Sequence, residues 1–291
     1  MRDSPSPTLG LTAPAKINLY LKVLGRRPDG YHELDSVLAR LTLADRLRLD
    51  FGGGPGEDRL TAATDLPGGL PPDFPGPANL ALRAVRAFRE RTGWPERPVA
   101  IHLEKAIPWG AGLGGGSADG AAVLAGLNRV APRPLAGSEL AGLALGLGAD
   151  LPFCLSGAVL ARAGGRGEAL SPPPPAFEAF RGRRLVLVKP AFNLATARVF
   201  KNLGLTNPPP ENNLGPLPVP PSGENDLLAP ALRLAPALAE VAAAIEACRP
   251  LAWGLSGSGP TFWFQPAEAA GPPGPLRARP DWWVRETAVA G

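Results

Sequence analysis

The sequence predicts an α+β protein of two domains. Strand-like and helical hydrophobic patterns alternate with each other in both halves of the chain. With 291 residues, the chain is long enough to build two hydrophobic cores. A Gly- and Pro-rich stretch at residues 164–175 separates the halves, so we predict domains at residues 1–167 and 168–291.

The N-terminal half begins with residues 15–24, which alternate and are rich in strand formers, followed by a turn at 25–30. Leu80, Leu82, Val85 and Phe88 recur at helical spacing, with arginines on the opposite face. The remaining predicted elements are strands at 34–43, 45–51 and 99–103 and helices at 118–128 and 138–147. The helix with the leucine and phenylalanine repeat covers residues 79–91.

Residues 140–161 are apolar enough to resemble a membrane span. Asp150 and Pro152 interrupt this run in its middle with a carboxylate and a helix-breaking residue. We therefore expect a helix, a sharp turn and a buried strand at 151–161, with no membrane association. The N-terminus carries no apolar signal core.

The C-terminal half shows the same mixture of patterns. Its predicted elements are a strand at 184–189, a short helix at 196–203, an irregular loop at 211–222, a long helix at 227–247, and strands at 261–265 and 282–289. Prolines cluster at 208–221, and no role is assigned to this segment.

Composition limits the classes of function. Charged residues make up 19% and apolar residues 45%, which is typical of a folded globular chain. A net charge of +4 suits anionic substrates, but no basic stripe is interleaved with aromatics, so we expect no nucleic acid partner. Cys154 and Cys248 lie in apolar surroundings without metal-ligand spacing, which predicts buried thiols and a reducing cytoplasm.

A glycine-rich loop is the most informative segment. Between Pro108 and Asp119, five glycines fall within seven positions, and an alanine-rich helical run follows at once. Glycine lets the backbone turn through positive φ and lets another group approach closely. The free N–H groups and positive dipole end of the following helix suit an anion, of which phosphate is the usual one.

Three other interpretations of this loop exist, and the residues argue against the first two. Gly110, Gly112 and Gly115 satisfy the dinucleotide fingerprint, but residues 127–137 lack the acidic residue which that motif requires. A P-loop needs a lysine after its last glycine, and here Ser117 follows Gly116. The third is a plain turn before a buried helix.

Lys16 and Asn18 share one face of the first strand, because side chains alternate along a strand. A strand lysine is most often solvated, but one between apolar neighbours and paired with an amide can hold an anion. Next, an Asp-Gly turn presents Tyr31 for stacking and His32 for hydrogen bonding. The alternative for this pair is a partly buried turn aromatic.

Asp150 is the best candidate for a general base, because a carboxylate inside an apolar run needs a partner or a function. Lys16 is an attractive partner for it. A second Gly/Ser loop at 253–261 contains Gly257, Ser258 and Gly259. This loop either supplies further N–H donors or is a tight connection, and Pro260 in it has no N–H to donate.

Taken in order, these motifs resemble those of the GHMP kinase superfamily. The resemblance rests on Pro-Ala-Lys-Ile-Asn at 14–18, on Pro-x-x-x-Gly-Leu-Gly-Gly-Gly-Ser ending at Ser117, and on the late Gly-Ser-Gly loop. It extends from about residue 13 to residue 264. It implies an N-terminal domain similar to domain 2 of ribosomal protein S5 and a ferredoxin-like C-terminal domain.

The resemblance also implies an ATP-dependent small-molecule kinase that uses Mg²⁺. Asp150 would accept the proton of the substrate hydroxyl or orient it, and Lys16 would keep Asp150 ionised and offset developing charge. Ser117 would lie near Mg²⁺. The ATP-binding positions it implies are Asn79, Lys105, Pro108, Gly110, Gly112, Leu113, Gly114, Gly115, Gly116 and Ser117. Asn79 and Lys105 belong to the adenine side.

Two further segments, Arg-Arg-Pro-Asp-Gly-Tyr-His ending at His32 and Gly-Ala-Asp-Leu-Pro-Phe at 148–153, resemble one member of the superfamily. That member phosphorylates the 2-hydroxyl of a cytidine-diphosphate methylerythritol in non-mevalonate isoprenoid synthesis. Tyr31 and Phe200 would enclose the cytosine, and His32 would bind its edge. Asn18 and Thr196 would also contact the substrate. The oligomeric state we expect is a monomer or weak homodimer.

One departure concerns position 119. The loop of the family often has asparagine where this chain has Asp119, so the role of this residue stays open. Two alternatives to the kinase also remain. One is another superfamily kinase, of the homoserine or mevalonate type, which would not need Tyr31 and Phe200. The other is a nucleotide- or RNA-binding module without catalysis, which would not need Lys16 and Asp150.

Overall fold

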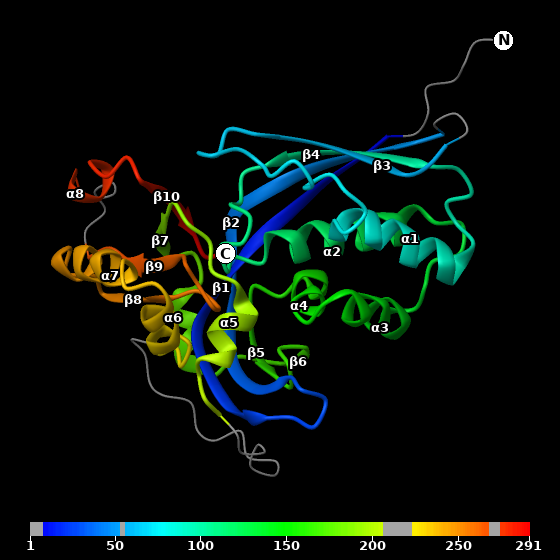
Figure 1. Ribbon diagram of the computed structural model, residues 1–291. Coiled ribbons are helices and arrows are strands. Elements are labelled where there is room, and N and C mark those ends of the chain that lie inside the picture. The colour runs from blue at the N-terminus through cyan, green and yellow to red at the C-terminus, as the bar shows by residue number, and fades with distance from the viewer. Residues whose placement is uncertain (1–7, 53–55, 206–222, 268–273) are drawn as a thin grey trace. The chain divides into compact units, whose positions relative to one another are not determined.

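The computed structural model describes residues 8–52, 56–205, 223–267 and 274–291 (Figure 1). Its contacts group the chain into two compact units that interleave along the sequence. Unit 1 comprises Met1–Ala15, Leu43–Trp109 and Gly114–Gly157, and unit 2 comprises Lys16–Thr42, Gly110–Leu113 and Ala158–Gly291. The predicted domain boundary after residue 167 follows the sequence instead, and it stays a proposal.

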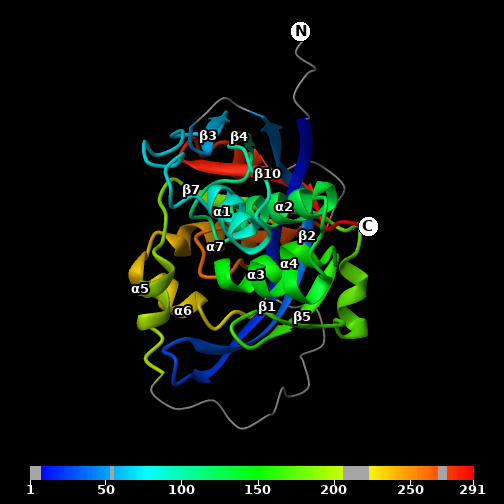
Figure 2. The ribbon, with the colours of Figure 1, turned by 90° about the vertical axis from the view of Figure 1, so that its right-hand side faces the viewer.

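Unit 1 is built on strands with helices packed against them. The elements that lie wholly in it are β3 (Arg59–Thr64), α1 (Leu80–Thr92), β4 (Val99–Lys105), α2 (Gly115–Val130), α3 (Gly137–Leu147) and α4 (Leu151–Ser156). Parts of β1 (Thr8–Arg26) and β2 (His32–Phe51) also belong to it. β4 pairs in parallel with β3 and antiparallel with β2. Helices α1 and α2 lie side by side along these strands (Figures 1 and 2).

The predicted helix at 79–91 is confirmed, and the sequence explains where it begins and ends. The Asn79 Oδ1 atom accepts a hydrogen bond from Ala81 N at 2.9 Å, which caps the first turn. At the other end Gly93 adopts φ 74°, the left-handed conformation that closes many helices. Between these caps, Leu82, Val85 and Phe88 enter the core of unit 1, as their spacing predicts.

Two predicted elements differ in the structure. The strand expected at 151–161 is wrong over its first part, because residues 151–156 form helix α4 and the strand β5 covers only Leu160–Gly164. A short apolar run does not distinguish a buried strand from a buried helix. Pro152 occupies the first turn of α4, where a missing N–H costs nothing, and Gly157 ends the helix at φ 76°.

The long helix predicted at 227–247 is instead two helices, α6 (Leu228–Leu234) and α7 (Leu238–Ala247). Pro236 lies between them and cannot donate the backbone hydrogen bond that a continuous helix needs. The strands predicted at 34–43 and 45–51 join into the single strand β2.

Unit 2 contains a second sheet, made of β7 (Arg184–Pro190), β8 (Ala252–Leu255), β9 (Phe262–Gln265) and β10 (Trp282–Ala288). The strands are ordered β10-β7-β9-β8 and every neighbouring pair is antiparallel. Helices α5 (Thr196–Lys201), α6 and α7 lie between β7 and β8 in the chain, and α8 (Gly274–Arg277) precedes β10. This strand order and connectivity form a split βαβ arrangement, so the ferredoxin-like prediction is confirmed.

A buried apolar cluster joins this sheet to its helices. It includes Val186 and Phe262 of the sheet and Val241 of α7, together with Leu21 and Val23 from strand β1. Helix α7 packs on β7 and β9, next to α6 in Figure 1. The first part of β2 pairs with β5, and β5 pairs with β6 (Ala169–Ser171), which is followed by a 3-10 helix at Pro175–Phe180.

The predicted irregular loop at 211–222 and the proline cluster at 208–221 lie outside the described residues. Of the helices that the structure describes, none combines the length and apolar character needed to cross a bilayer.

Candidate active site

The first predicted pair, Lys16 and Asn18, lies buried on one face of β1, with 5% of each residue exposed. Lys16 Nζ donates a hydrogen bond to Asn18 Oδ1 at 3.0 Å, which confirms that the two side chains share a strand face. The Asn18 amide donates in turn to Ser36 Oγ at 2.8 Å. The amide is therefore held by β2 and orients the ammonium group.

The first half of the glycine loop packs in unit 2 against the second Gly/Ser loop. Gly112 O accepts a hydrogen bond from Ser256 Oγ at 2.9 Å, and Leu113 O accepts one from Lys16 N at 2.9 Å. A Cβ atom at Gly112 would lie 2.3 Å from Ser256 O, and the residue has φ +76°. Only glycine fits here, because both the space and the backbone conformation exclude a side chain.

Residues before and within α5 adjoin these two loops. A Cβ atom at Gly110 would lie 3.1 Å from the side-chain amide carbon of Asn193, so this amide lies directly against the loop. Thr196 Oγ1 and Ser258 Oγ form a hydrogen bond at 2.9 Å. The structure thus brings Thr196, predicted to bind substrate, to the late glycine loop. The sequence did not point to Asn193.

The aromatic residues predicted to bind a base also lie in unit 2. Tyr31 is 55% exposed, and the guanidinium carbon of Arg166 lies 4.7 Å from the centre of its ring. His32 stacks on Phe200, with ring centres 4.8 Å apart. A stacking platform therefore exists, while the enclosure of a cytosine between Tyr31 and Phe200 stays a prediction. Arg166 follows a glycine turn, and no pattern in the sequence indicated it.

The environment of His32 favours its neutral form. Burial lowers the pKa of the imidazole, and the positive charge of Arg26 lowers it further. A neutral imidazole has one donor and one acceptor nitrogen, which suits binding to the polar edge of a base.

The second half of the glycine loop opens helix α2 in unit 1. Gly114 adopts φ 67° before the helix, and no side chain caps this end. The first helical hydrogen bond runs from Ala118 N to Gly114 O at 2.8 Å. The amides of Gly115, Gly116 and Ser117 precede that bond, so this turn retains the donors and dipole end that bind anions.

Lys105 lies behind this turn rather than on the surface. Its ammonium group forms ion pairs with Asp45 and with Asp119 Oδ2, the latter at 3.1 Å. Asp45 Oδ1 also accepts hydrogen bonds from Ala106 N and Ile107 N at 2.7 and 2.8 Å. Burial raises the pKa of Asp119 to about 7, against the opposing charge of Lys105. An acidic residue inside an apolar strand pattern was the one sequence signal for Asp45.

Asp150 immediately precedes α4 and is half-buried, but its side chain does not cap that helix. Asn79 uses its side chain to cap α1 and to donate to Phe74 O at 3.0 Å. Lys16 and Asp150 belong to different units, so the predicted pairing between them stays a prediction.

Among the described residues no cluster of three or more His, Cys, Asp or Glu side chains is arranged to hold a metal ion.

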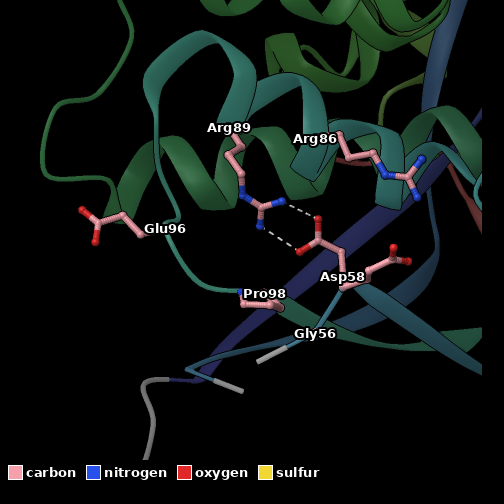
Figure 3. A pocket seen from close by; sticks show the side chains of 7 residues that line it. Gly56, Asp58, Arg86, Arg89, Glu96 and Pro98 are labelled. Atoms are coloured by element: carbon pink, nitrogen blue, oxygen red, sulfur yellow. Dashed lines mark hydrogen bonds and ion pairs between the residues drawn. The ribbon is translucent and has the colours of Figure 1, made fainter. Parts of the chain in front are cut away.

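A cavity of about 490 Å³ lies in unit 1 at the start of β3 (Figure 3). Arg89 and Asp58 both line it, and the Arg89 guanidinium donates hydrogen bonds to both carboxylate oxygens of Asp58, at 2.6 and 2.8 Å. Asp58 also accepts a hydrogen bond from Val99 N at 2.9 Å. These contacts tie α1 to β3 and β4. None of the predicted site residues lines this cavity, so we assign it a structural role.

Comparison with known proteins relates this arrangement to a class. The GHMP kinases N terminal domain matches residues 79–158. A homoserine kinase from Cytophaga hutchinsonii shares the fold, with a TM-score of 0.62 at 18% identity over 99% of this chain and 97% of its own. The matched domain and the shared fold therefore relate the chain to the GHMP class, as the motifs predict.

More similar proteins narrow the class. A 4-diphosphocytidyl-2-C-methyl-D-erythritol kinase of Rhizobium etli is 39% identical over 94% of this chain and 92% of its own length. The enzyme of that name in Paramagnetospirillum magneticum is 37% identical, over 95% and 97%. A crystal structure of a 4-(cytidine 5'-diphospho)-2C-methyl-D-erythritol kinase matches with a TM-score of 0.71 and 36% identity, over 96% of this chain and 99% of that one. The chain belongs to the 4-diphosphocytidyl-2-C-methyl-D-erythritol kinase family.

Proposed function

We propose that this chain transfers the γ-phosphoryl group of ATP to the 2-hydroxyl group of 4-diphosphocytidyl-2-C-methyl-D-erythritol, in non-mevalonate isoprenoid synthesis. One observation carries the proposal. In a chain of this family, the oriented Lys16–Asn18 pair adjoins the packed glycine loops, since Lys16 N donates to Leu113 O at 2.9 Å. We further propose that the protein is cytoplasmic and a monomer or weak homodimer, without nucleic acid or membrane partners.

For the nucleotide, we propose that the amides of Gly110 to Ser117 bind the ATP phosphates. The uncapped start of α2 supports this role, because its donors and dipole favour an anion. Ser117 Oγ, in the first turn of α2, would hold a magnesium ion, a cation that prefers oxygen ligands. Such an ion would neutralise charge on the phosphates as the group transfers.

For the chemistry, we propose that Asp150 accepts the proton of the acceptor hydroxyl or orients that hydroxyl. The hydroxyl oxygen attacks the γ-phosphorus in line. Lys16 offsets the negative charge that develops on the transferring group. Phosphoryl transfer needs mainly positioning and electrostatic stabilisation, so these two residues and the loop suffice. The hydrogen bond from Lys16 to Asn18 supports this role, because it orients the ammonium group.

For the acceptor, we propose that Tyr31 and Phe200 stack on the cytosine and that His32 bonds its edge. The exposed Tyr31 ring and the lowered pKa of His32 support these roles. Thr196 and Asn18 contact the rest of the substrate. The hydrogen bond between Thr196 and Ser258 supports this placement, since it joins the acceptor side to the late glycine loop.

The test mixes the purified protein with ATP, Mg²⁺ and one of three acceptors, and follows ADP release. We expect release with 4-diphosphocytidyl-2-C-methyl-D-erythritol that exceeds release without acceptor. Homoserine and mevalonate are the comparison acceptors. Faster turnover with either of them would reassign the acceptor within the GHMP class. Absence of ADP release with all three would contradict the kinase assignment.

A further inference from the structure

A buried ionic cluster lies at the entrance and exit of the glycine-rich loop. It consists of Lys105 at the end of β4, Asp45 on β2 and Asp119 in α2, all inside unit 1. The exposed fractions are 4% for Lys105, 0% for Asp45 and 1% for Asp119. Burial of three ionisable groups has a large desolvation cost, which only mutual pairing and hydrogen bonding can offset. Such a cluster needs a functional or architectural explanation.

Each carboxyl group holds one end of the loop. Asp45 Oδ1 accepts hydrogen bonds from the backbone amides of Ala106 and Ile107, the two residues that lead into the loop. Asp119 belongs to α2, which begins where the loop ends. Lys105 bonds to both carboxyl groups and so connects the two ends.

The first residue of α2 is shaped around this cluster. A Cβ atom at Gly115 would lie 2.8 Å from Lys105 Nζ and 3.0 Å from the Ile107 side chain. Gly115 has no positive φ, so its glycine serves close approach rather than a turn. The ammonium group therefore lies directly beneath the turn whose amides are proposed to bind phosphate.

We propose that Lys105, Asp45 and Asp119 are positioning residues that set the place of the first α2 turn, and that Lys105 acts on ATP through the loop rather than by touching adenine. The inference rests on the proposed function only in taking this loop as the nucleotide phosphate site. If Lys105 reached out to a base, two buried carboxyl groups would lose their cation, at a cost far above that of a surface contact.

The environment of the second carboxyl oxygen of Asp119 is consistent with a role in positioning the first α2 turn. Asp119 Oδ1 is buried and has no hydrogen-bond partner among the residues that the structure describes. Its other oxygen, Oδ2, accepts a hydrogen bond from Lys105 Nζ at 3.1 Å. Replacement by alanine would remove that contact, whereas asparagine keeps an oxygen able to accept from Lys105.

The experiment measures equilibrium binding of ADP and of adenosine by titration calorimetry on the full-length protein. We expect Asp119→Ala to weaken ADP binding by about tenfold or more, because displaced donors lose their alignment with phosphate. Adenosine affinity should stay unchanged, since adenosine carries no phosphate. Asp119→Asn should restore most of the ADP affinity, and Lys105→Met should resemble Asp119→Ala.

Glu139→Gln is the matched control, because Glu139 pairs with Arg91 on the surface of unit 1 and its loss should alter neither affinity. If Lys105→Met weakens the binding of ADP and of adenosine equally, Lys105 contacts the nucleoside and the inference is overturned. ADP binding by Asp119→Ala at the wild-type level would overturn it too. The Asp119 variants decide the matter even if Lys105→Met does not fold. Because no acceptor is present, failure of the proposed acceptor chemistry would be visible separately in the ADP-release assay.

Discussion

At the scale of single residues, the candidate site is defined by hydrogen bonds that leave little freedom to its polar groups. Asn18 Oδ1 accepts a hydrogen bond from the Lys16 ammonium, and Asn18 Nδ2 donates one to Ser36 Oγ, so both the oxygen and the nitrogen of the side-chain amide are hydrogen-bonded. The Trp263 indole N–H donates to Asn18 O at 2.9 Å and anchors the backbone at the same residue. Such fixed geometry is what phosphoryl transfer requires of its charged groups.

Asp150→Asn should abolish turnover while nucleotide binding persists. An amide cannot accept the hydroxyl proton as a carboxylate does, so we expect kcat to fall by about 10²–10⁴. Initial rates at saturating ATP and acceptor measure kcat, and ADP titration measures nucleotide binding. Turnover within a fewfold of the wild type would remove Asp150 from the role of base.

The pH dependence of acceptor binding should report on His32. The pKa of this imidazole lies below its usual value, so the neutral form prevails at neutral pH and protonation occurs only under acidic conditions. The contribution of neutral His32 to folding stability depends on pH in the same direction. It is present above the ordinary pKa of histidine and is lost as the pH falls through the lowered pKa of the folded state.

We therefore expect the acceptor KM to be constant above pH 7 and to rise at acidic pH, because a protonated imidazole has no acceptor nitrogen. The measurement is KM for acceptor and for ATP from pH 5 to 8, about the range in which histidine titrates. In His32→Asn the acidic rise should disappear. A rise that persists in this variant would assign it to another group.

At the scale of elements, the first half of the glycine-rich loop packs on the late Gly/Ser loop, because the Gly112 backbone contacts Ser256. A Cβ at Gly257 would lie 3.4 Å from Gly112 O and 3.6 Å from Asn18 Oδ1, so the late loop also lies beside the Lys16–Asn18 strand. Strand β1, the first half of the glycine-rich loop and the late loop thus come together within unit 2. Helix α2 holds the other half of the glycine-rich loop in unit 1.

Gly112→Ala should separate these loops. The new Cβ would clash with Ser256 O at 2.3 Å, and alanine would be forced into φ +76°, a strain of about 1–2 kcal/mol. We expect kcat/KM for ATP to fall by at least about tenfold. Gly142→Ala in α3 is the control, because a Cβ there meets nothing within 4 Å. If both variants keep wild-type kcat/KM, contact between the loops is not needed for ATP use.

At the scale of the whole molecule, residues early in the sequence complete the core of unit 2. Leu21 and Val23 of β1 join the apolar cluster of the C-terminal sheet. Leu21 N also donates to Glu224 O at 3.0 Å, and Asp226 N donates to Leu21 O at 3.0 Å. A division after residue 167 would therefore separate one sheet from part of its core.

The fragment 168–291 tests this division. It contains all of β7 to β10, so we expect circular dichroism to show secondary structure. Without Leu21 and Val23 its free energy of unfolding should fall by about 1.5–3 kcal/mol for each lost side chain, and an apolar dye should bind. Denaturant unfolding of the fragment and of the full chain provides the comparison. A fragment as stable as the intact chain would support an independent domain there.

Much of this architecture is foreseeable from local patterns. The helix at 79–91, the strands at 184–189, 261–265 and 282–289 and the free amides at the start of α2 follow from spacing and glycine, because these features depend on neighbours within a few residues. Strand β8 was not predicted, because residues 253–255 were assigned to the Gly/Ser loop at 253–261. The strand at 151–161 and the unbroken helix at 227–247 fail for different reasons. Apolar runs carry no sign of the helix α4 that tertiary packing selects, and Pro236 outweighs helix propensity on both sides.

By itself, the sequence determined the order and chemical identity of the motifs: a strand lysine with its amide, a glycine-rich loop before a helix, a carboxylate in an apolar run and a late glycine loop. Tertiary structure alone decided which of them touch. Asp45 with Lys105 and Asp119, Gly112 with Ser256, and His32 with Phe200 are contacts across long stretches of chain. No local pattern encodes them, because side chains distant in sequence meet only where packing and strand register bring their backbones together.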